Sequence, residues 1–222
     1  MKRALAIAGL ALVVACTPPA PRNTGVYLLL DTSGTYRNEL RKAEDVILFT
    51  LSRLEPADTF AVARIDTGSF SEKDIIAKAT FDERPSTANA QKRAFAQRVQ
   101  DFIHRSNASN HTDITGGLLQ AVEFLNEKNS GRKTILIFSD LEQDLEAGYV
   151  RDVPLAFQGF EVVALNVVKL RSDNYDPREY MGRLEEWRAQ VERNGGKWRV
   201  VNDLDRLDGY MEIGRASCRE RV

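Results

Sequence analysis

The stretch that decides the fold is 25–35, which has the sequence Gly-Val-Tyr-Leu-Leu-Leu-Asp-Thr-Ser-Gly-Thr. Its apolar half is typical of a strand that is buried on both faces, as in the centre of a parallel sheet. The change to polar residues at Asp31 marks the end of that strand. Because ligands of open α/β sheets bind outside the carboxyl ends of the strands, the same stretch predicts where a site would lie.

Strand-like and helix-like segments alternate through the rest of the chain. The short connection around Gly68 suits an antiparallel hairpin. The alternation predicts an α/β, Rossmann-like, doubly wound fold, in which a mostly parallel six-stranded sheet has one antiparallel edge strand. Further strands are expected at 59–65, 75–81, 133–138, 161–168 and 197–201, and helices at 40–54, 88–104 and 180–191, around Leu118, Val122 and Leu125, and from 204 to 211.

The bulk properties limit the classes of protein to consider. The chain has 222 residues, of which 43% are hydrophobic and 28% charged, which suits one globular domain with a proper core. The formal net charge of -1 argues against a nucleic-acid binder, since such proteins normally carry a basic face.

The first residues have the order of a bacterial lipoprotein signal peptide. Lys2 and Arg3 precede an apolar run that ends Val-Val-Ala before Cys16, which resembles a lipobox. The run is about a dozen residues long, whereas a bilayer span needs roughly 20. We therefore expect a signal peptide at 1–15 and a lipid on Cys16, although an ordinary secretory signal followed by a chance cysteine is an alternative.

A proline-rich tether at 16–24 then holds the domain close to the membrane. Thr17 is not the aspartate associated with inner-membrane retention. We therefore expect an anchor in the outer membrane, with the domain facing the periplasm, if the source is Gram-negative.

The last residues, 212–222, resemble a translated sequencing adapter, and a genuine basic tail is the alternative. We interpret 25–211 as the natural domain, interrupted near Met211. Without Cys218, and with Cys16 lipidated, the domain has no cysteine for a disulfide or a thiolate metal site.

Three loops bring oxygen-bearing side chains to the predicted carboxyl edge of the sheet. Asp31, Ser33 and Thr35 follow the first strand, Thr112 precedes a helix, and Asp140 follows the apolar strand at 133–138. Carboxylates and hydroxyls are hard ligands, which suit Mg²⁺, Mn²⁺ or Ca²⁺.

This pattern resembles the von Willebrand factor A family, whose metal-ion-dependent adhesion site has the form D-x-S-x-S, a distant threonine and a distant aspartate. The resemblance covers nearly all of 24–211. It implies that Asp31, Ser33, Thr35, Thr112 and Asp140 hold one divalent ion, and that a protein partner completes the ion's shell with a Glu or Asp side chain. It thus implies binding rather than catalysis.

Two positions depart from the family pattern. Thr35 stands where the family has serine, which keeps the hydroxyl but adds a methyl group. Asn110 and His111 replace a double glycine before the threonine.

Other interpretations of the same residues remain open. Ser33, Thr35 and Thr112 are also residues that cap helices. The stretch ending at Asp31 also resembles the nucleophile loop of haloacid-dehalogenase-type phosphotransferases, with Asp140 and Asp144 as distal magnesium carboxylates. Those phosphatases, however, have a second aspartate, their general acid, where Ser33 stands. A third possibility is a structural envelope protein with a degenerate site.

Overall fold

The computed structural model describes residues 21–34, 36, 39–66, 71–105, 109–148 and 153–204. Several sequence-based expectations lie outside these residues. They are the signal peptide, Cys16, the predicted ligand Thr35, the hairpin turn at Gly68, most of the last helix and the adapter-like tail.

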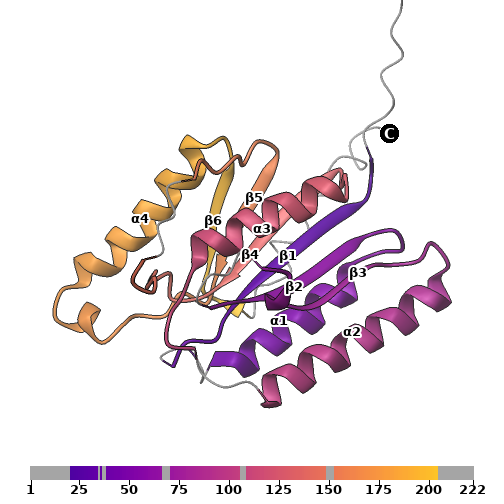
Figure 1. Cartoon of the computed structure of the whole chain (residues 1–222), viewed down its shortest axis with the longest axis horizontal. Coiled ribbons are helices and arrows are strands. Elements are labelled where there is room, and N and C mark those ends of the chain that lie inside the picture. The colour runs from indigo at the N-terminus through magenta and orange to yellow at the C-terminus, as the bar shows by residue number, and fades with distance from the viewer. Residues whose placement is uncertain are drawn as a thin grey trace, which may run out of the picture.

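The sheet has six strands in the order β3-β2-β1-β4-β5-β6 (Figure 1). The strand β3 is antiparallel to β2, and all other neighbours are parallel, which confirms the predicted fold class. The strands are β1 (Thr24–Asp31), β2 (Thr59–Ile65), β3 (Ile75–Thr80), β4 (Arg132–Phe138), β5 (Phe160–Leu165) and β6 (Lys197–Val201).

The strand β1 lies at the centre because its apolar residues fill both cores. Successive side chains of a strand point to opposite faces. Accordingly Val26, Leu28 and Leu30 belong to one hydrophobic core, whereas Tyr27 and Leu29 belong to the other.

Four α-helices cover the two faces. Helices α1 (Leu40–Arg53) and α2 (Pro85–Arg105) pack on the first core. Helices α3 (Ile114–Glu127) and α4 (Pro177–Arg193) pack on the second, and Figure 1 shows α3 in front of the sheet and α4 to the left of β6. Two short 3-10 helices, η2 (Glu72–Asp74) and η3 (Ser172–Asn174), lie before β3 and α4. No helix among the described residues is long and apolar enough to cross a membrane.

The strand order places a topological switch point between β1 and β4. From β1 the chain moves outward to β2 and β3, and from β4 it moves outward on the other side to β5 and β6. The connections after β1 and β4 therefore run in opposite directions, and in open sheets of this kind ligands bind at such a switch point.

Several predicted bounds differ from the observed ones by one to three residues, and one of these differences has a clear cause in the backbone. The strand β5 ends at Leu165 rather than at 168. The reason is Asn166, whose φ of 52° lies in the left-handed region, so that the chain turns out of the sheet there.

Candidate metal-binding site

Asp31 lies at the end of β1 and is fully buried. Its Oδ1 accepts a hydrogen bond from the Ser33 amide at 2.8 Å, and its Oδ2 accepts one from the Ser139 hydroxyl at 2.7 Å. Burial raises the pKa of Asp31, while the hydrogen bonds from Ser139 and Ser33 oppose this increase. In the described part of the chain these donors are all neutral, so the hydrogen bonds bring no positive charge to a buried carboxylate.

Asp140 reaches the same place from β4. The parallel register aligns Leu30 with Phe138, so Ser139 lies beside Asp31 and Asp140 follows one residue later. Asp140 is 2% exposed, and its Oδ1 accepts a hydrogen bond from the Glu142 amide at 3.0 Å. The two aspartates thus end neighbouring strands at the switch point.

The loop before α3 brings in Thr112. The Ser109 amide donates to the Thr32 carbonyl at 2.9 Å, which attaches this loop to the one after β1. Thr112 is buried and pairs in both directions with Asp144, with N–H···O distances of 2.9 and 3.0 Å. Thr112 is therefore attached to the chain that follows Asp140 as well.

Of the five predicted ligands, the structure places four at this switch point, on three loops joined by hydrogen bonds. Ser33 is half-buried, and the other three are buried. The fifth, Thr35, lies outside the described residues.

The helix-capping interpretation is wrong for Thr112. The N-cap of α3 is Asp113, whose Oδ1 accepts a hydrogen bond from the Gly116 amide at 2.8 Å. The Thr112 hydroxyl is therefore not needed to begin α3. For Ser33 capping stays a prediction, because residues 35, 37 and 38 before Glu39, the N-cap of α1, lie outside the described residues.

Sequence reasoning did not assign a role to Ser139 or Gln143. The Ser139 hydroxyl donates to Asp31 and accepts from the Leu141 amide at 3.0 Å. The Gln143 Oε1 accepts hydrogen bonds from the Thr115 amide and hydroxyl at 2.9 and 2.7 Å. For Ser139 the signal was its position directly after a strand next to β1, whereas Gln143 has no such signal.

The donor set fits a divalent cation in chemistry and burial. Two buried carboxylates and the hydroxyls of Ser33 and Thr112 are hard oxygen ligands of the kind that Mg²⁺ and Mn²⁺ prefer. Among the described residues no three His, Cys, Asp or Glu side chains gather as a metal-binding group. A site here therefore depends on hydroxyls as well as on carboxylates.

Comparisons with known proteins agree on the architecture. No protein-family model matches the chain. The human inter-alpha-trypsin inhibitor heavy chain H1 is 28% identical over 106 residues, which is 47% of this chain and 10% of that protein. The solved structure of the pilus adhesin SpaC from Lactobacillus rhamnosus GG, in an open conformation, has a TM-score of 0.53 and 15% identity, over 86% of this chain and 29% of that one.

A second solved structure, a von Willebrand factor type A protein from Catenulispora acidiphila, has a TM-score of 0.51 and 17% identity, over 87% of this chain and 42% of that one. The chain thus spans less than half the length of each of these proteins. Strand order, the antiparallel edge strand and these likenesses together show that the described residues form a von Willebrand factor A-like domain.

Proposed function

We propose that this chain is a metal-dependent protein-binding module, held at the bacterial cell envelope by a lipid on Cys16. The observation that carries the proposal is the pair of buried carboxylates, Asp31 and Asp140, at the switch point of the sheet. Burying a carboxylate is costly unless a positive charge compensates it. A divalent ion at this edge supplies that charge.

The ligands divide by charge. Ser33, Thr35 and Thr112 offer neutral oxygens, and Asp31 and Asp140 offer negative charge, directly or through bound water. An ion held mainly by neutral oxygens stays electrophilic, so it supplies a site for a carboxylate from outside. In this proposal the chain's own residues hold the ion through these oxygens and leave one coordination position open. The partner that fits is a protein that presents a Glu or Asp side chain.

Binding is better supported than phosphoryl transfer. A nucleophilic Asp31 needs an oxygen that can approach phosphorus, but both of its oxygens accept hydrogen bonds and the residue is fully buried. Ser33 also lacks the carboxyl group that would act as general acid.

The cell-envelope assignment rests on two supports. One is the N-terminal sequence, in which two basic residues, an apolar run and a cysteine follow one another before the domain. The other is the likeness in fold to a pilus adhesin, which favours a role in contacts between proteins at the cell surface or in the envelope.

Titration calorimetry with Mg²⁺ and Mn²⁺ tests the proposal. We expect the parent to bind one ion, and Asp31→Asn to bind it at least about 10-fold more weakly, because a ligand is lost while the size of the side chain is kept. Asp58→Asn is the matched control. Asp58 is also a buried aspartate that accepts amide hydrogen bonds, from Thr24 at 2.6 Å and Glu55 at 2.7 Å, but it lies next to the amino end of β2.

A folded parent that binds neither ion contradicts the proposal and favours the structural protein with a degenerate site. If the parent binds the ion, the same ion is expected to be required for retention of a partner, and a chelator is expected to release it. Retention that survives the chelator would place the interaction elsewhere on the domain.

A further inference from the structure

The residues that follow β4 form a loop with a strained backbone at its centre. Leu141 has a φ of 66°, in the left-handed region that a branched side chain rarely adopts, and its side chain is 1% exposed. Such a conformation persists only where the surroundings fix it. We call residues 139–144 the metal loop, since it contains Asp140.

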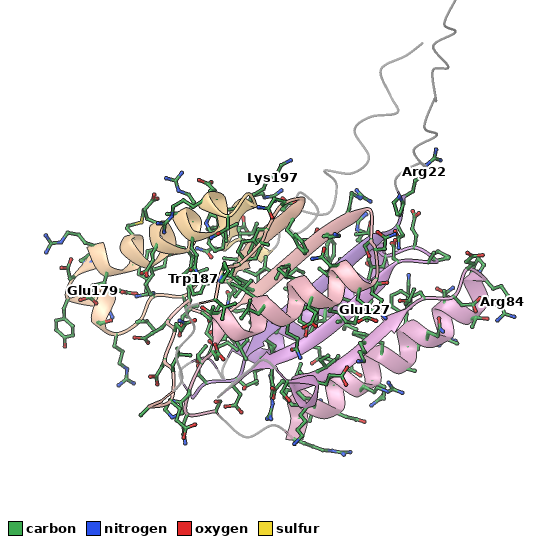
Figure 2. The ribbon with its side chains drawn as sticks, turned by 45° about the horizontal axis from the view of Figure 1, so that its top comes forward. Arg22, Arg84, Glu127, Glu179, Trp187 and Lys197 are labelled. Carbon is green, nitrogen blue, oxygen red and sulfur yellow. The ribbon has the colours of Figure 1, made fainter. Side chains whose placement is uncertain are left out.

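Helix α4 contacts this loop through two side chains. The Arg183 Nε donates to the carbonyl of Asp140 at 3.3 Å, and the Trp187 Nε1 donates to the carbonyl of Leu141 at 3.1 Å. Arg183 and Trp187 are four residues apart, so they lie on the same face of the helix. In Figure 2 Trp187 lies on the side of α4 that faces the rest of the domain, whereas Glu179 lies at the outer end of the helix.

The Arg183 guanidinium is itself held in place. It makes a bidentate ion pair with Asp173, at 2.9 and 2.8 Å, and Asp173 is 1% exposed. This guanidinium holds the pKa of Asp173 below its usual range. Asp173 also accepts a hydrogen bond from the Leu170 amide at 2.7 Å. A buried ion pair adds little stability compared with apolar residues of the same size, but its geometry fixes the orientation of both groups.

The opposite side of the metal loop is attached to α3 through Gln143 to Thr115, and to the loop before α3 through Asp144 to Thr112. The loop is therefore fixed from two helices. The side chains from α4 are the ones that bind the carbonyls of Asp140 and Leu141, at the strained position.

We propose that Arg183 and Trp187 form a clamp that holds the metal loop with the Asp140 carboxylate directed at the ion. Both are positioning residues, and the inference rests on the proposed function for its effect on metal binding. Without the clamp the backbone of the metal loop relaxes around Leu141. The free energy of ion binding then includes the cost of ordering this loop again.

The clamp is tested with Trp187→Phe, which keeps an aromatic ring but removes the N–H donor, and with Arg183→Lys, which keeps the charge but loses the planar fork. We expect the affinity for Mg²⁺ and Mn²⁺, measured by calorimetry, to fall about 10–100-fold, as is typical when partners of metal ligands are removed. The control is Val191→Ala, because Val191 is fully buried on the same helix and its aliphatic side chain makes no polar contact. It is expected to lower the melting temperature and leave metal affinity unchanged.

Amide hydrogen exchange without any metal gives a second measurement. We expect the amides of 139–144 to exchange faster in both clamp variants than in Val191→Ala, while the amides of β1 and β4 stay protected. Exchange and metal affinity that match those of Val191→Ala would overturn the clamp. If the parent itself binds no ion, the proposed function fails, and exchange in the loop alone decides whether the clamp exists.

Discussion

Asp31 is placed where its charge is costly to the metal-free fold. It is fully buried, and burial is the largest cause of its raised pKa. The hydrogen bonds from Ser33 and Ser139 offset part of that cost. A charged residue at a position where it lowers the stability of the fold is typical of a binding site.

This cost predicts an unusual effect of Asp31→Asn. A pKa that is higher in the folded than in the unfolded chain means that the folded chain keeps the proton longer as the pH rises. The free energy of unfolding therefore falls through that range, and the loss is complete above the folded pKa. Because Asn carries no charge, we expect the variant to be more stable than the metal-free parent at pH 7, by of order 1 kcal/mol, or roughly 2–4 °C in melting temperature.

The measurement is thermal unfolding in the presence of a chelator, repeated from neutral pH down to about 4, where an ordinary aspartate begins to take up its proton. The difference is expected to shrink as the pH falls. With Mg²⁺ at 100 times the parent's dissociation constant the order reverses, because the ion adds about 2.7 kcal/mol to the parent but at most about 1.4 kcal/mol to a variant that binds at least about 10-fold more weakly. A variant less stable than the metal-free parent at pH 7 would contradict this account.

Single residues differed in how well the sequence revealed them. The proximity of Asp31 and Asp140 was predictable, because each comes at the end of a buried apolar run and neighbouring parallel strands have their carboxyl ends on the same side of the sheet. Arg183 and Trp187 were not, since they lie 43 and 46 residues along the chain from the carbonyls they contact, and no pattern in the sequence marks such contacts.

Among the helices, α3 lies unusually close to the sheet at its beginning. A Cβ added to Gly117 would lie 2.7 Å from Ile65 Cγ2 and 2.9 Å from Leu29 Cδ2, both in fully buried side chains. The glycine thus lets α3 approach β1 and β2 directly beside the Thr112 loop.

Two glycine-to-alanine changes are therefore expected to have opposite effects. Overpacking at Gly117 costs about 1–3 kcal/mol, which outweighs the helix preference for alanine of about 1 kcal/mol. Gly182, in α4, is exposed and has no atom within 4 Å of an added Cβ, so Gly182→Ala is expected to stabilise by about 0.5–1 kcal/mol. Urea unfolding of both variants measures the difference, and changes of the same sign would show that packing does not set the position of α3.

The elements themselves were largely predictable, because hydrophobic periodicity reports burial. The bounds of β2 and β6 were predicted to the residue. The end of β5 was not, since the left-handed turn at Asn166 leaves the apolar pattern unchanged through Val168. The cap of α3 was also missed, because Thr112 and Asp113 are both capping residues and only the geometry distinguishes them.

At the scale of the whole molecule, the chain enters the domain at the opposite end of the sheet from the proposed site. It enters at the amino ends of the parallel strands, here called the amino edge, and the proposed site lies at their carboxyl ends. Asn23 is fixed at the amino edge, where its carbonyl accepts hydrogen bonds from the amides of Gly131 and Arg132 at 3.1 and 3.2 Å. Figure 2 shows Arg22 and Glu127 toward this end of the domain and Glu179 at the other. The site begins where β1 ends, after 8 residues or about 26 Å of strand.

This arrangement predicts which edge faces the membrane when Cys16 carries a lipid. From Cys16 to Thr24 the chain reaches at most about 28 Å even when fully extended, so the amino edge is expected to stay near the bilayer and the proposed metal site to point away from it. We expect a donor fluorophore at Glu127→Cys to transfer more energy to acceptors on the lipid headgroups than one at Glu179→Cys, with Cys218→Ser in both so that one thiol takes the label.

The same measurement separates the anchor from the orientation. With Cys16→Ser added, transfer is expected to disappear from both positions, and transfer that remains would show that the lipid is not what holds the chain at the membrane. If the anchor holds but Glu179→Cys transfers as much as Glu127→Cys, the domain lies on its side. Partners in the same membrane would then reach the ion, instead of partners that approach from the compartment in which the domain lies.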